Sequence, residues 1–550
     1  MMNDVLPLSA LKHNFKHLAV KPAFYQPDGA RQRVWTWEEV EKAVRSLIGG
    51  LHDLGLGKGD AVAIYGKNSA EWIIADWAVM LAGMVSIPIY PTANEETLAF
   101  VIERTKCKAV FIGKVDDYQI GQRVFSSSLA QIALPCDSID GPIEWKDWMA
   151  QKSFTGEFFK GAADSVISIM YTSGSTGTPK GVELTQSAYA SACGDTARWL
   201  NVNQSDRLFS YLPLAHIAER VVTEGMMIYA PGAVTYFSES LETFIDDLKA
   251  AKPTVFFSVP RLWAKFLASI YHTVPKKKLS SLLNDPSVNQ SIKRKIKCSL
   301  GFEETRVWVS AAAPIAREII EEFEAFDIYI SEAWGMTEVT GAGCINYPFK
   351  SSMIGTIGKP FTDAQVRLSQ DNEIQVKGRN VFERYHLNPK VTAESFTGDG
   401  WFRTKDRGEW DEQGALKIVG RLKDEFKTTT GKYIIPSPIE AMMCNHDIIE
   451  LACVMGSNRP QPFAAVVLSD TASLLDKDAI RRELERFLQN TNESLENHQK
   501  LSHILVASEP WTIENNMLTP TMKIRRFEIE ARFKEAASTL NKQEKILWCK

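Results

Sequence analysis

Short apolar runs alternate with amphipathic segments through the first 420 residues, and this repeat limits the possible folds more than any other feature. The apolar runs predict strands at residues 61–65, 109–112, 166–171, 207–212, 254–259, 306–310 and 328–330. Helical periodicity follows several of them, at residues 71–81, 188–200 and 315–326. Between residues 364 and 379 the period shortens towards two, which predicts a small antiparallel section. Because strands that alternate with helices form sheets covered by helices, the pattern predicts an α/β fold with parallel or mixed sheets.

A second domain is predicted after residue 421. A chain of 550 residues is too long for one core. A predicted strand ends at Gly420, and the charged residues 421–424 follow it. The segments beyond predict strands at 451–455 and 464–468 and helices at 477–489 and 526–537. We therefore predict a large N-terminal domain at 1–421 and a small α+β domain at 422–550.

Composition excludes several classes of protein. The chain has 63 basic and 67 acidic residues and a net charge of −4, which argues against a nucleic-acid-binding protein. The cysteines are scattered without zinc or redox spacing. No signal peptide or membrane-spanning run is found, so a cytoplasmic protein is predicted. Two basic clusters, at 276–278 and 293–297, leave a peripheral membrane contact open.

The segment from Tyr171 to Gly181 carries the sharpest chemical signal. It follows a predicted strand, and it is rich in glycine and hydroxyl side chains before a Pro-Lys-Gly sequence. Such a loop points its backbone amides at one centre and adds a cation, which is how proteins cradle phosphate groups. It is not a Walker loop, because no Lys-Ser or Lys-Thr pair follows the last glycine. The residues expected to hold phosphate are Thr172, Ser173, Gly174, Ser175, Thr176, Gly177 and Lys180.

This loop resembles the signature of the adenylate-forming (AMP-binding) superfamily, and four further motifs of that family follow in order. They are Trp334-Gly335-Met336-Thr337-Glu338, residues 400–406, residues 420–424 and residues 518–523. The resemblance covers almost the whole chain. It implies a small C-terminal domain that is mobile about a hinge near Lys423–Asp424.

The resemblance implies a reaction in which a carboxylate attacks the α-phosphate of ATP and expels pyrophosphate. Because both reactants are anions, the site must neutralise charge and exclude water. Glu338 would bind Mg²⁺, Thr337 would donate to the α-phosphate, and Trp334 would stack on adenine. Asp406 and Arg421 would hold the ribose, and Lys523 would reach the α-phosphate. Ala312 and Gly431 complete the nucleotide-binding positions that the resemblance implies.

The acyl substrate is indicated by the segment 210–220, which resembles long-chain acyl-CoA synthetases. Amino-acid-activating relatives carry an aspartate near the position of His216, whereas the residues on either side of His216 are apolar here. A fatty acid is therefore favoured over an amino acid. His216 itself has two interpretations, as a gate of the acyl pocket or as a hydrogen-bonded core histidine.

The chain departs from the family pattern in two places where the family has glycine. Ala311 and Ala312 replace glycines that border the adenine and acyl sites, and Lys405 replaces the glycine before the ribose aspartate. A third departure, the longer segment 428–433 around Gly431, is shared with some long-chain members. These glycine replacements could reshape the acyl channel or alter nucleotide binding.

The leading hypothesis is an ATP-dependent long-chain fatty acid–CoA ligase that uses Mg²⁺, ATP and CoA. An acyl-AMP ligase that delivers the acyl group to a carrier protein is the alternative. A non-catalytic acyl or nucleotide sensor is the second alternative, against which the retained Lys180, Glu338, Asp406, Arg421 and Lys523 argue. The sequence does not determine the oligomeric state or the chain length of the acid.

Overall fold

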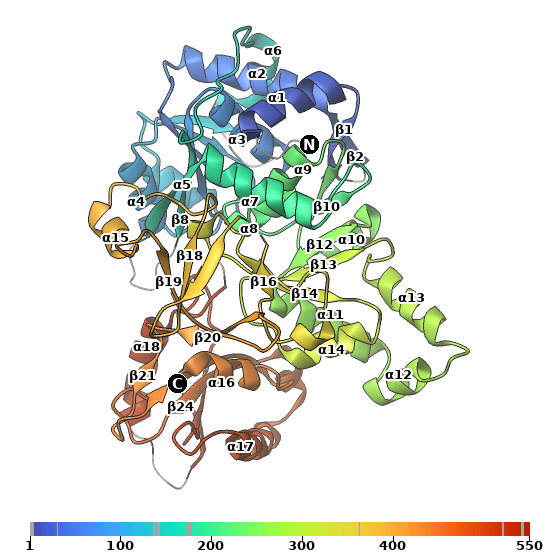
Figure 1. Cartoon of the computed structure of the whole chain (residues 1–550), viewed down its shortest axis with the longest axis vertical. Coiled ribbons are helices and arrows are strands. Elements are labelled where there is room, and N and C mark those ends of the chain that lie inside the picture. Colours follow the sequence, from blue (N-terminus) through green and yellow to red (C-terminus); the bar gives the residue numbers. More distant parts are fainter. Residues whose placement is uncertain are drawn as a thin grey trace. The chain divides into compact units, whose positions relative to one another are not determined.

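The chain folds into two compact units. The computed structural model describes residues 5–29, 31–135, 139, 143–172, 179–361, 363–519, 522–538, 540 and 544–549. The N-terminal unit comprises residues 1–313, 317–366 and 376–402, and the C-terminal unit comprises residues 314–316, 367–375 and 403–550. Blue to yellow colours follow most of the first unit in Figure 1, and orange to red colours follow most of the second.

A mainly parallel sheet in the N-terminal unit carries the predicted phosphate loop. Its strand order is β7-β6-β5-β3-β4-β8-β9, and β8 and β9 form an antiparallel hairpin at one edge. The strands are β3 (Ala61–Tyr65), β4 (Val85–Ile89), β5 (Ala109–Ile112), β6 (Ala130–Ala133), β7 (Ile143–Glu144), β8 (Val166–Thr172) and β9 (Lys180–Thr185). The phosphate loop therefore joins the two strands of an edge hairpin.

Two further sheets lie wholly within the N-terminal unit. One has the order β10-β11-β1-β2, with β10 (Arg207–Ser210), β11 (Val234–Phe237), β1 (Pro22–Asp28) and β2 (Arg31–Thr36). The other has the order β12-β13-β14-β15-β16, with β12 (Val255–Ser258), β13 (Val307–Ser310), β14 (Ile330–Trp334), β15 (Cys344–Ile345) and β16 (Lys359–Pro360). Strands β12 to β14 are parallel, and β15 and β16 add antiparallel pairs.

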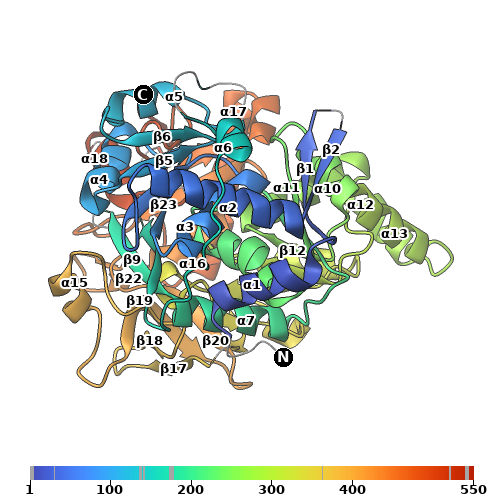
Figure 2. The same cartoon turned by 90° about the horizontal axis from the view of Figure 1, so that it is seen from above.

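Helices pack against these sheets. Every residue of α3 (Ala70–Leu81) is buried, as expected of a helix that is apolar on most of its circumference. Figure 2 shows α1 (Pro7–Leu18) beside α2 (Trp37–Asp53), and α2 also packs on α3. The other helices of this unit are α4 (Glu95–Thr105), α5 (Tyr118–Val124), α6 (Trp145–Gln151), α7 (Gln186–Trp199), α8 (Ile217–Glu219), α9 (Met226–Tyr229), α10 (Phe244–Ala251), α11 (Pro260–Thr273), α12 (Lys276–Leu283), α13 (Asn289–Ser299), α14 (Arg317–Glu324) and α15 (Pro389–Glu394). Shorter turns are η1 (Arg220–Gly225), η2 (Thr337–Val339) and η3 (Ser351–Met353).

The C-terminal unit is an α+β structure around a sheet with the order β23-β24-β25-β26. Its strands are β23 (Ile449–Met455), β24 (Phe463–Leu468), β25 (Ile504–Val506) and β26 (Ile546–Trp548), and a hairpin of β21 (Phe426–Lys427) and β22 (Tyr433–Ile434) precedes them. Its helices are α16 (Pro436–Met443), η4 (Asp470–Leu474), α17 (Lys477–Ser494) and α18 (Arg526–Ser538). Strands β17 (Gln365–Leu368), β18 (Glu373–Lys377), β19 (Phe402–Trp410) and β20 (Leu416–Arg421) form one more sheet, and the boundary between the units falls within them.

The predicted fold class is confirmed. The strands expected at 61–65 and 109–112 have the bounds of β3 and β5, and α7 and α14 differ from the expected helices by one or two residues at each end. The sequence also indicated the antiparallel section between 364 and 379, which contains β17 and β18. The domain boundary at 421 and the hinge near Lys423–Asp424 remain predictions. Among the described residues, no helix combines the length and the apolar character needed to cross a membrane.

A buried arginine ties helix α3, strand β8 and the π-helical turn η1 together. Arg220 is fully buried; its Nη1 donates to Ser168 Oγ on β8 at 2.7 Å, and its Nε donates to Glu224 Oε2 at 3.1 Å. Its Nη2 pairs with the buried Asp76 of α3. Trp77 Nε1 donates to the other oxygen of Glu224 at 2.9 Å. One guanidinium therefore satisfies polar groups from three elements inside the core.

We expect Arg220→Met to destabilise the N-terminal unit strongly. The substitution fills a similar volume but leaves two carboxyl groups buried without a cation, which costs about 3–5 kcal/mol of the free energy of unfolding. Urea unfolding followed by tryptophan fluorescence measures this loss. Arg123→Gln is the control, because the Arg123–Glu95 pair is about half exposed on both sides and should contribute about 1 kcal/mol or less. Similar unfolding midpoints for the two variants would contradict the assignment.

Candidate active site

The strands on either side of the phosphate loop are well placed to hold it. Strand β8 ends at Thr172 and β9 begins at Lys180, and the two residues are paired across the hairpin. The Thr172 hydroxyl donates to the Lys180 carbonyl oxygen at 3.5 Å, the upper limit for a hydrogen bond. Five predicted phosphate-binding residues lie outside the described residues: Ser173, Gly174, Ser175, Thr176 and Gly177.

A segment at 380–388 joins the phosphate-loop hairpin to the Thr337–Glu338 turn. At one end, the Asn380 side chain donates to the carbonyl oxygens of Val339 and Ala342 at 3.2 and 2.6 Å. At the other end, the His386 amide donates to the Gly181 carbonyl oxygen at 2.7 Å. The His386 ring also lies 2.8 Å from Glu183 of β9. This segment holds two sequence-distant motifs at a fixed spacing.

The side chain of Tyr385 contacts both motifs. Its hydroxyl donates to Glu338 Oε1 at 2.7 Å, and Lys180 Nζ lies 5.5 Å from the centre of its ring. That distance is within the range of a cation–π contact. Burial, and then the neighbouring Glu338 carboxylate, raise the pKa of the Tyr385 hydroxyl, so it remains a hydrogen-bond donor. Lys180, Tyr385 and Glu338 thus form one connected group.

The backbone around Glu338 depends on a glycine. Gly335 approaches the Gly341 carbonyl so closely that a Cβ on Gly335 would lie 2.1 Å from its oxygen. The tight turn buries Glu338 and leaves Thr337 half-buried beside it. Trp334, at the end of β14, is also buried. The Trp-Gly-x-Thr-Glu spacing therefore has a steric reason, and Gly335 cannot be replaced without moving the turn.

The oxygen ligands at this site suit a hard cation such as Mg²⁺, which would be bound by phosphate oxygens as well as by the protein. Within the part of the chain that the structure describes, no group of three or more His, Cys, Asp or Glu residues could hold a metal ion. Mg²⁺ is commonly held by one or two carboxylates together with phosphate oxygens and water. Glu338 fits that role, since Tyr385 fixes one of its oxygens and orients the carboxylate.

His216 caps a helix. Its Nδ1 accepts a hydrogen bond from the Ala218 amide at 3.2 Å at the start of α8, and its ring is half-buried. Nearby, the buried Glu219 accepts from the Tyr211 amide and the Thr223 hydroxyl, each at 3.2 Å. Burial raises the pKa of Glu219 to about 8. The segment therefore holds a carboxyl group that is protonated at neutral pH, which sequence analysis did not single out.

Two of the three glycine replacements noted in the sequence have left-handed backbone. Ala312 has φ of 72° and Lys405 has φ of 63°. Met522, directly before Lys523, has φ of 61°. Glycine adopts this region freely, whereas other residues pay a steric penalty of about 1–2 kcal/mol. Strained backbone of this kind is concentrated at functional sites, so the three positions support the motif assignments as a hypothesis.

The predicted ribose-binding pair lies within the C-terminal unit. Asp406 on β19 faces Arg421 on β20, and Arg421 Nε lies 3.0 Å from Asp406 Oδ1. Gly431 turns the chain with φ of 81°, and its amide donates to the Thr428 carbonyl at 3.0 Å. The Lys523 amide donates to the Thr519 hydroxyl at 3.1 Å.

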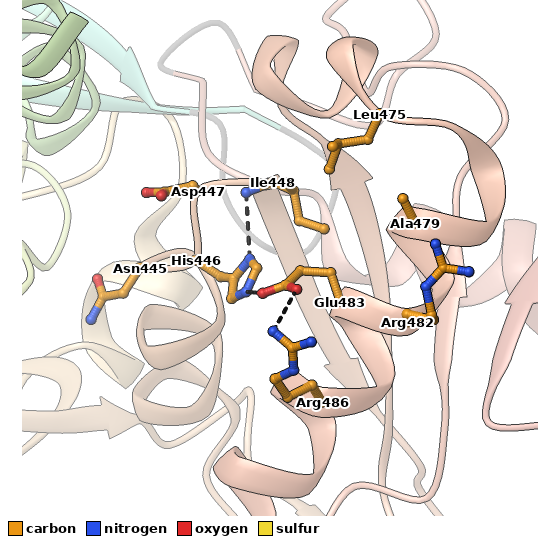
Figure 3. A pocket seen from close by; sticks show the side chains of 9 residues that line it. All are labelled: Asn445, His446, Asp447, Ile448, Leu475, Ala479, Arg482, Glu483 and Arg486. Carbon is orange, nitrogen blue, oxygen red and sulfur yellow. Dashed lines mark hydrogen bonds and ion pairs between the residues drawn. The ribbon is translucent and has the colours of Figure 1, made fainter. Parts of the chain in front are cut away.

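Two hollows on the molecule could serve as alternative ligand sites. Figure 3 shows one of about 460 Å³ on the C-terminal unit, between α17 and the turn at 445–448. Its charged side chains pair with one another: Glu483 lies 3.5 Å from the His446 ring and 3.1 Å from Arg486. None of the motif residues lines it. The other, of about 190 Å³, lies beside Lys180 and Tyr171 and belongs to the surroundings of the phosphate-loop hairpin.

The comparisons with protein families decide the assignment. The profile of the AMP-binding enzyme family matches residues 11–386, and that of the AMP-binding enzyme C-terminal domain matches residues 423–545. The chain belongs to the AMP-binding enzyme family. The predicted resemblance is thereby confirmed.

Curated relatives and solved structures agree with this family. The chain is 29% identical to a peroxisomal long chain acyl-CoA synthetase 6 of Arabidopsis thaliana, over 98% of this chain and 87% of that protein. It is also 29% identical to long-chain-fatty-acid–CoA ligase 5 of Mus musculus, over 87% and 80%. The adenylation domain of a carboxylate reductase from Mycobacterium chelonae superposes with a TM-score of 0.83 at 19% identity, covering 97% and 91%. An anthranilate CoA ligase in complex with anthranoyl-AMP gives 0.79 at 20% identity, covering 97% and 98%.

Within this AMP-binding enzyme, each unit groups its own predicted residues. The N-terminal unit brings Lys180 and Glu338 together through Tyr385, and the C-terminal unit pairs Asp406 with Arg421. Tyr385 was missed because no pattern in the sequence marks it. The only available signal was its place in a short segment, after a predicted antiparallel section and before Asn388-Pro389.

We expect Lys405→Gly to stabilise the C-terminal unit by about 1 kcal/mol. Glycine removes the steric penalty of a left-handed backbone, although it raises the entropy of the unfolded chain. Thermal unfolding measures the change. Lys417→Gly is the matched control, because Lys417 lies in the next strand, β20, and glycine should destabilise an extended strand position. If both variants lose stability equally, the backbone of Lys405 is not strained.

Proposed function

We propose that this enzyme activates a fatty acid with ATP to form acyl-AMP and pyrophosphate, and then transfers the acyl group to CoA with release of AMP. The coarser assignment, an AMP-forming acid–CoA ligase, follows from the family and from the relatives named as CoA ligases. The observation that carries the proposal is the Lys180–Tyr385–Glu338 group beside the phosphate-loop hairpin. This group would supply a cation and an oriented carboxylate to a nucleoside triphosphate.

The chemistry requires charge to be cancelled at the α-phosphate. In the proposed reaction, the fatty carboxylate attacks phosphorus, the bond to the bridging oxygen of pyrophosphate breaks, and the electron pair leaves with pyrophosphate. Lys180 would neutralise part of the charge of the β- and γ-phosphates, and Thr337 would donate to the α-phosphate. Glu338 would hold Mg²⁺, which supplies further positive charge when bound. Trp334 would offer its indole face to adenine.

The C-terminal unit would supply the remaining contacts. Asp406 would accept hydrogen bonds from the ribose hydroxyls, and its pairing with Arg421 at 3.0 Å fixes the carboxylate for that purpose. Lys523 would bring an ammonium group to the α-phosphate for the first half-reaction. We propose that this unit then turns about Lys423–Asp424 and carries Lys523 away for thioester formation.

A long-chain fatty acid is the proposed acyl substrate. The support is the apolar segment around His216 and the names of the relatives, which are long-chain acyl-CoA synthetases and ligases. His216 would border the acyl chain while it caps α8. Ala312, with its left-handed backbone at the end of β13, would border the adenine and acyl sites.

Product analysis tests the proposal directly. The enzyme is incubated with a long-chain fatty acid, MgATP and either CoA or an acyl carrier protein, and the products are identified by mass spectrometry. Acyl-CoA, AMP and pyrophosphate are expected. If the acyl carrier protein is the only acylated product, the acyl acceptor is a carrier protein and not CoA. Pyrophosphate exchange with amino acids but not with fatty acids would overturn the substrate assignment.

The two half-reactions should separate at Lys523. A charge aimed at the reacting phosphate is worth about a hundredfold to a thousandfold in rate, so Lys523→Ala should slow acyl-AMP formation by that factor. Transfer to CoA from supplied acyl-AMP should remain close to normal, because that step does not need the lysine. Lys423→Pro should do the opposite, since proline restricts the backbone rotation of the proposed hinge. Equal losses in both half-reactions for Lys523→Ala would contradict the two-step model.

Tyr385→Phe should reduce the rate of acyl-AMP formation by about tenfold to a hundredfold. The change removes one hydrogen bond to a carboxylate and leaves the ring beside Lys180 in place. It should also raise the Mg²⁺ concentration needed for half-maximal rate, which an effect on folding alone would not do. Tyr329→Phe is the control, because Tyr329 is exposed and lies outside the site. An unchanged Mg²⁺ dependence would show that Tyr385 does not orient Glu338.

A further inference from the structure

The hairpin of α12 and α13 concentrates positive charge on a chain that is otherwise slightly acidic. Residues 276–299 contain seven Lys or Arg residues and one Asp, a net charge of +6, whereas the whole chain has −4. In both Figure 1 and Figure 2 the two helices extend outward beyond α10 and α11 of the same unit. The charge is therefore placed on the outermost part of this region.

Two of these cations attach the hairpin to the body of the N-terminal unit. Lys276 pairs with Glu322 of α14, and Lys293 lies 2.8 Å from Asp327. A third, Lys297, lies over the Trp308 ring at 5.8 Å. These contacts fix the hairpin and use the acidic groups that α14 and the following turn present to it.

Four cations of the hairpin remain exposed. Lys277, Lys278, Arg294 and Lys295 are exposed, and none of them forms an ion pair with any residue that the structure describes. The nearby Glu303 is already paired with Lys252 at 2.9 Å. Asp285, in the turn between the helices, accepts hydrogen bonds from Ser287.

The geometry of the hairpin sets these four charges side by side. Residues 284–288 turn the chain between α12 and α13, and the two helices are in contact. Each pair, 277–278 and 294–295, lies five to six residues from the turn, which is about 8 Å of helix at 1.5 Å per residue. The pairs therefore stand at the same height on neighbouring helices.

Lys277 and Lys278 do not stabilise the helix that carries them. They lie in the first turn of α12, where the helix dipole disfavours cations and where this helix has no acidic residue. Leu279 and Ile296 are buried, and no large apolar side chain of residues 276–299 is exposed. The outer face thus offers charge and small polar groups without an apolar or aromatic anchor.

We propose that the outer face of the α12–α13 hairpin docks on an anionic lipid bilayer. A protein partner would be expected to find an apolar or aromatic centre for a stable interface, and this face has none. A lipid surface needs only charge, because clustered Lys and Arg residues bind anionic headgroups electrostatically. The purpose of docking rests on the proposed function, since long-chain fatty acids dissolve preferentially in bilayers.

Vesicle sedimentation tests the proposal on the full chain. The probes are vesicles of neutral phosphatidylcholine and vesicles in which about a third is anionic phosphatidylglycerol. Each Lys or Arg near an anionic surface contributes about fivefold to the partition coefficient, so replacing Lys277, Lys278, Arg294 and Lys295 by Gln should weaken binding by about a hundredfold or more. Raised salt should release the wild-type protein, because the charges are exposed.

A matched variant controls for net charge. Lys16, Lys42, Lys146 and Lys534 are exposed and lie outside the hairpin, and their replacement by Gln changes the net charge equally. This control should bind anionic vesicles as the wild type does. Equal loss in both variants, binding independent of anionic lipid, or no binding by the wild type would each overturn the proposal. Retention on heparin that is lost with the hairpin charges, without vesicle binding, would point to another polyanion instead.

The same variants separate docking from catalysis. With a shorter, water-soluble fatty acid, the hairpin variant should form acyl-CoA at the wild-type rate, because its substitutions lie outside the site. With a long-chain acid supplied in anionic vesicles, its rate should fall while that of the control variant does not. Vesicle binding by an inactive protein would uphold the docking surface and reject the proposed function alone.

Discussion

The buried guanidinium of Arg220 is the interaction on which the order of the N-terminal unit depends. Burial, and then the charge of Asp76, raise the pKa of Glu224, and Arg220 pairs with both Asp76 and Glu224. Through Ser168 the same side chain reaches β8, which ends at the phosphate loop. Through η1 it fixes the chain just after His216. A single cation therefore links strand β8 to the segment that follows His216.

At the candidate active site, a tyrosine lies between the carboxylate and the lysine. The segment 380–388 is irregular, yet it is hydrogen-bonded at both ends and carries Tyr385 between Glu338 and Lys180. An exposed lysine and a flexible carboxylate would lose side-chain entropy when they order around phosphate. Because Tyr385 orders one of them in advance and lies against the other, less of that entropy remains to be lost on binding.

Sequence reasoning succeeded where a feature is local. Strands β3 and β5 are continuous apolar runs, and the sequence predicted both with their observed bounds. It failed where a role comes from contacts distant in the chain: Tyr385 is 47 residues from Glu338, and Glu219 looks like an ordinary polar residue until its burial is known. The glycine replacements are intermediate. The sequence showed that Lys405 and Ala312 are unusual, and only the backbone angles explain why.

The left-handed residues have a consequence for how such an enzyme can change. Ala312, Lys405 and Met522 each lie in or beside a motif, and each occupies a conformation that glycine or asparagine would adopt more easily. Single substitutions at these positions would therefore release strain at the proposed nucleotide-binding motifs while leaving the rest of each sheet intact. Laboratory evolution for heat resistance would be expected to select such substitutions early. The turnover rates of the resulting variants would show whether the backbone strain contributes to catalysis.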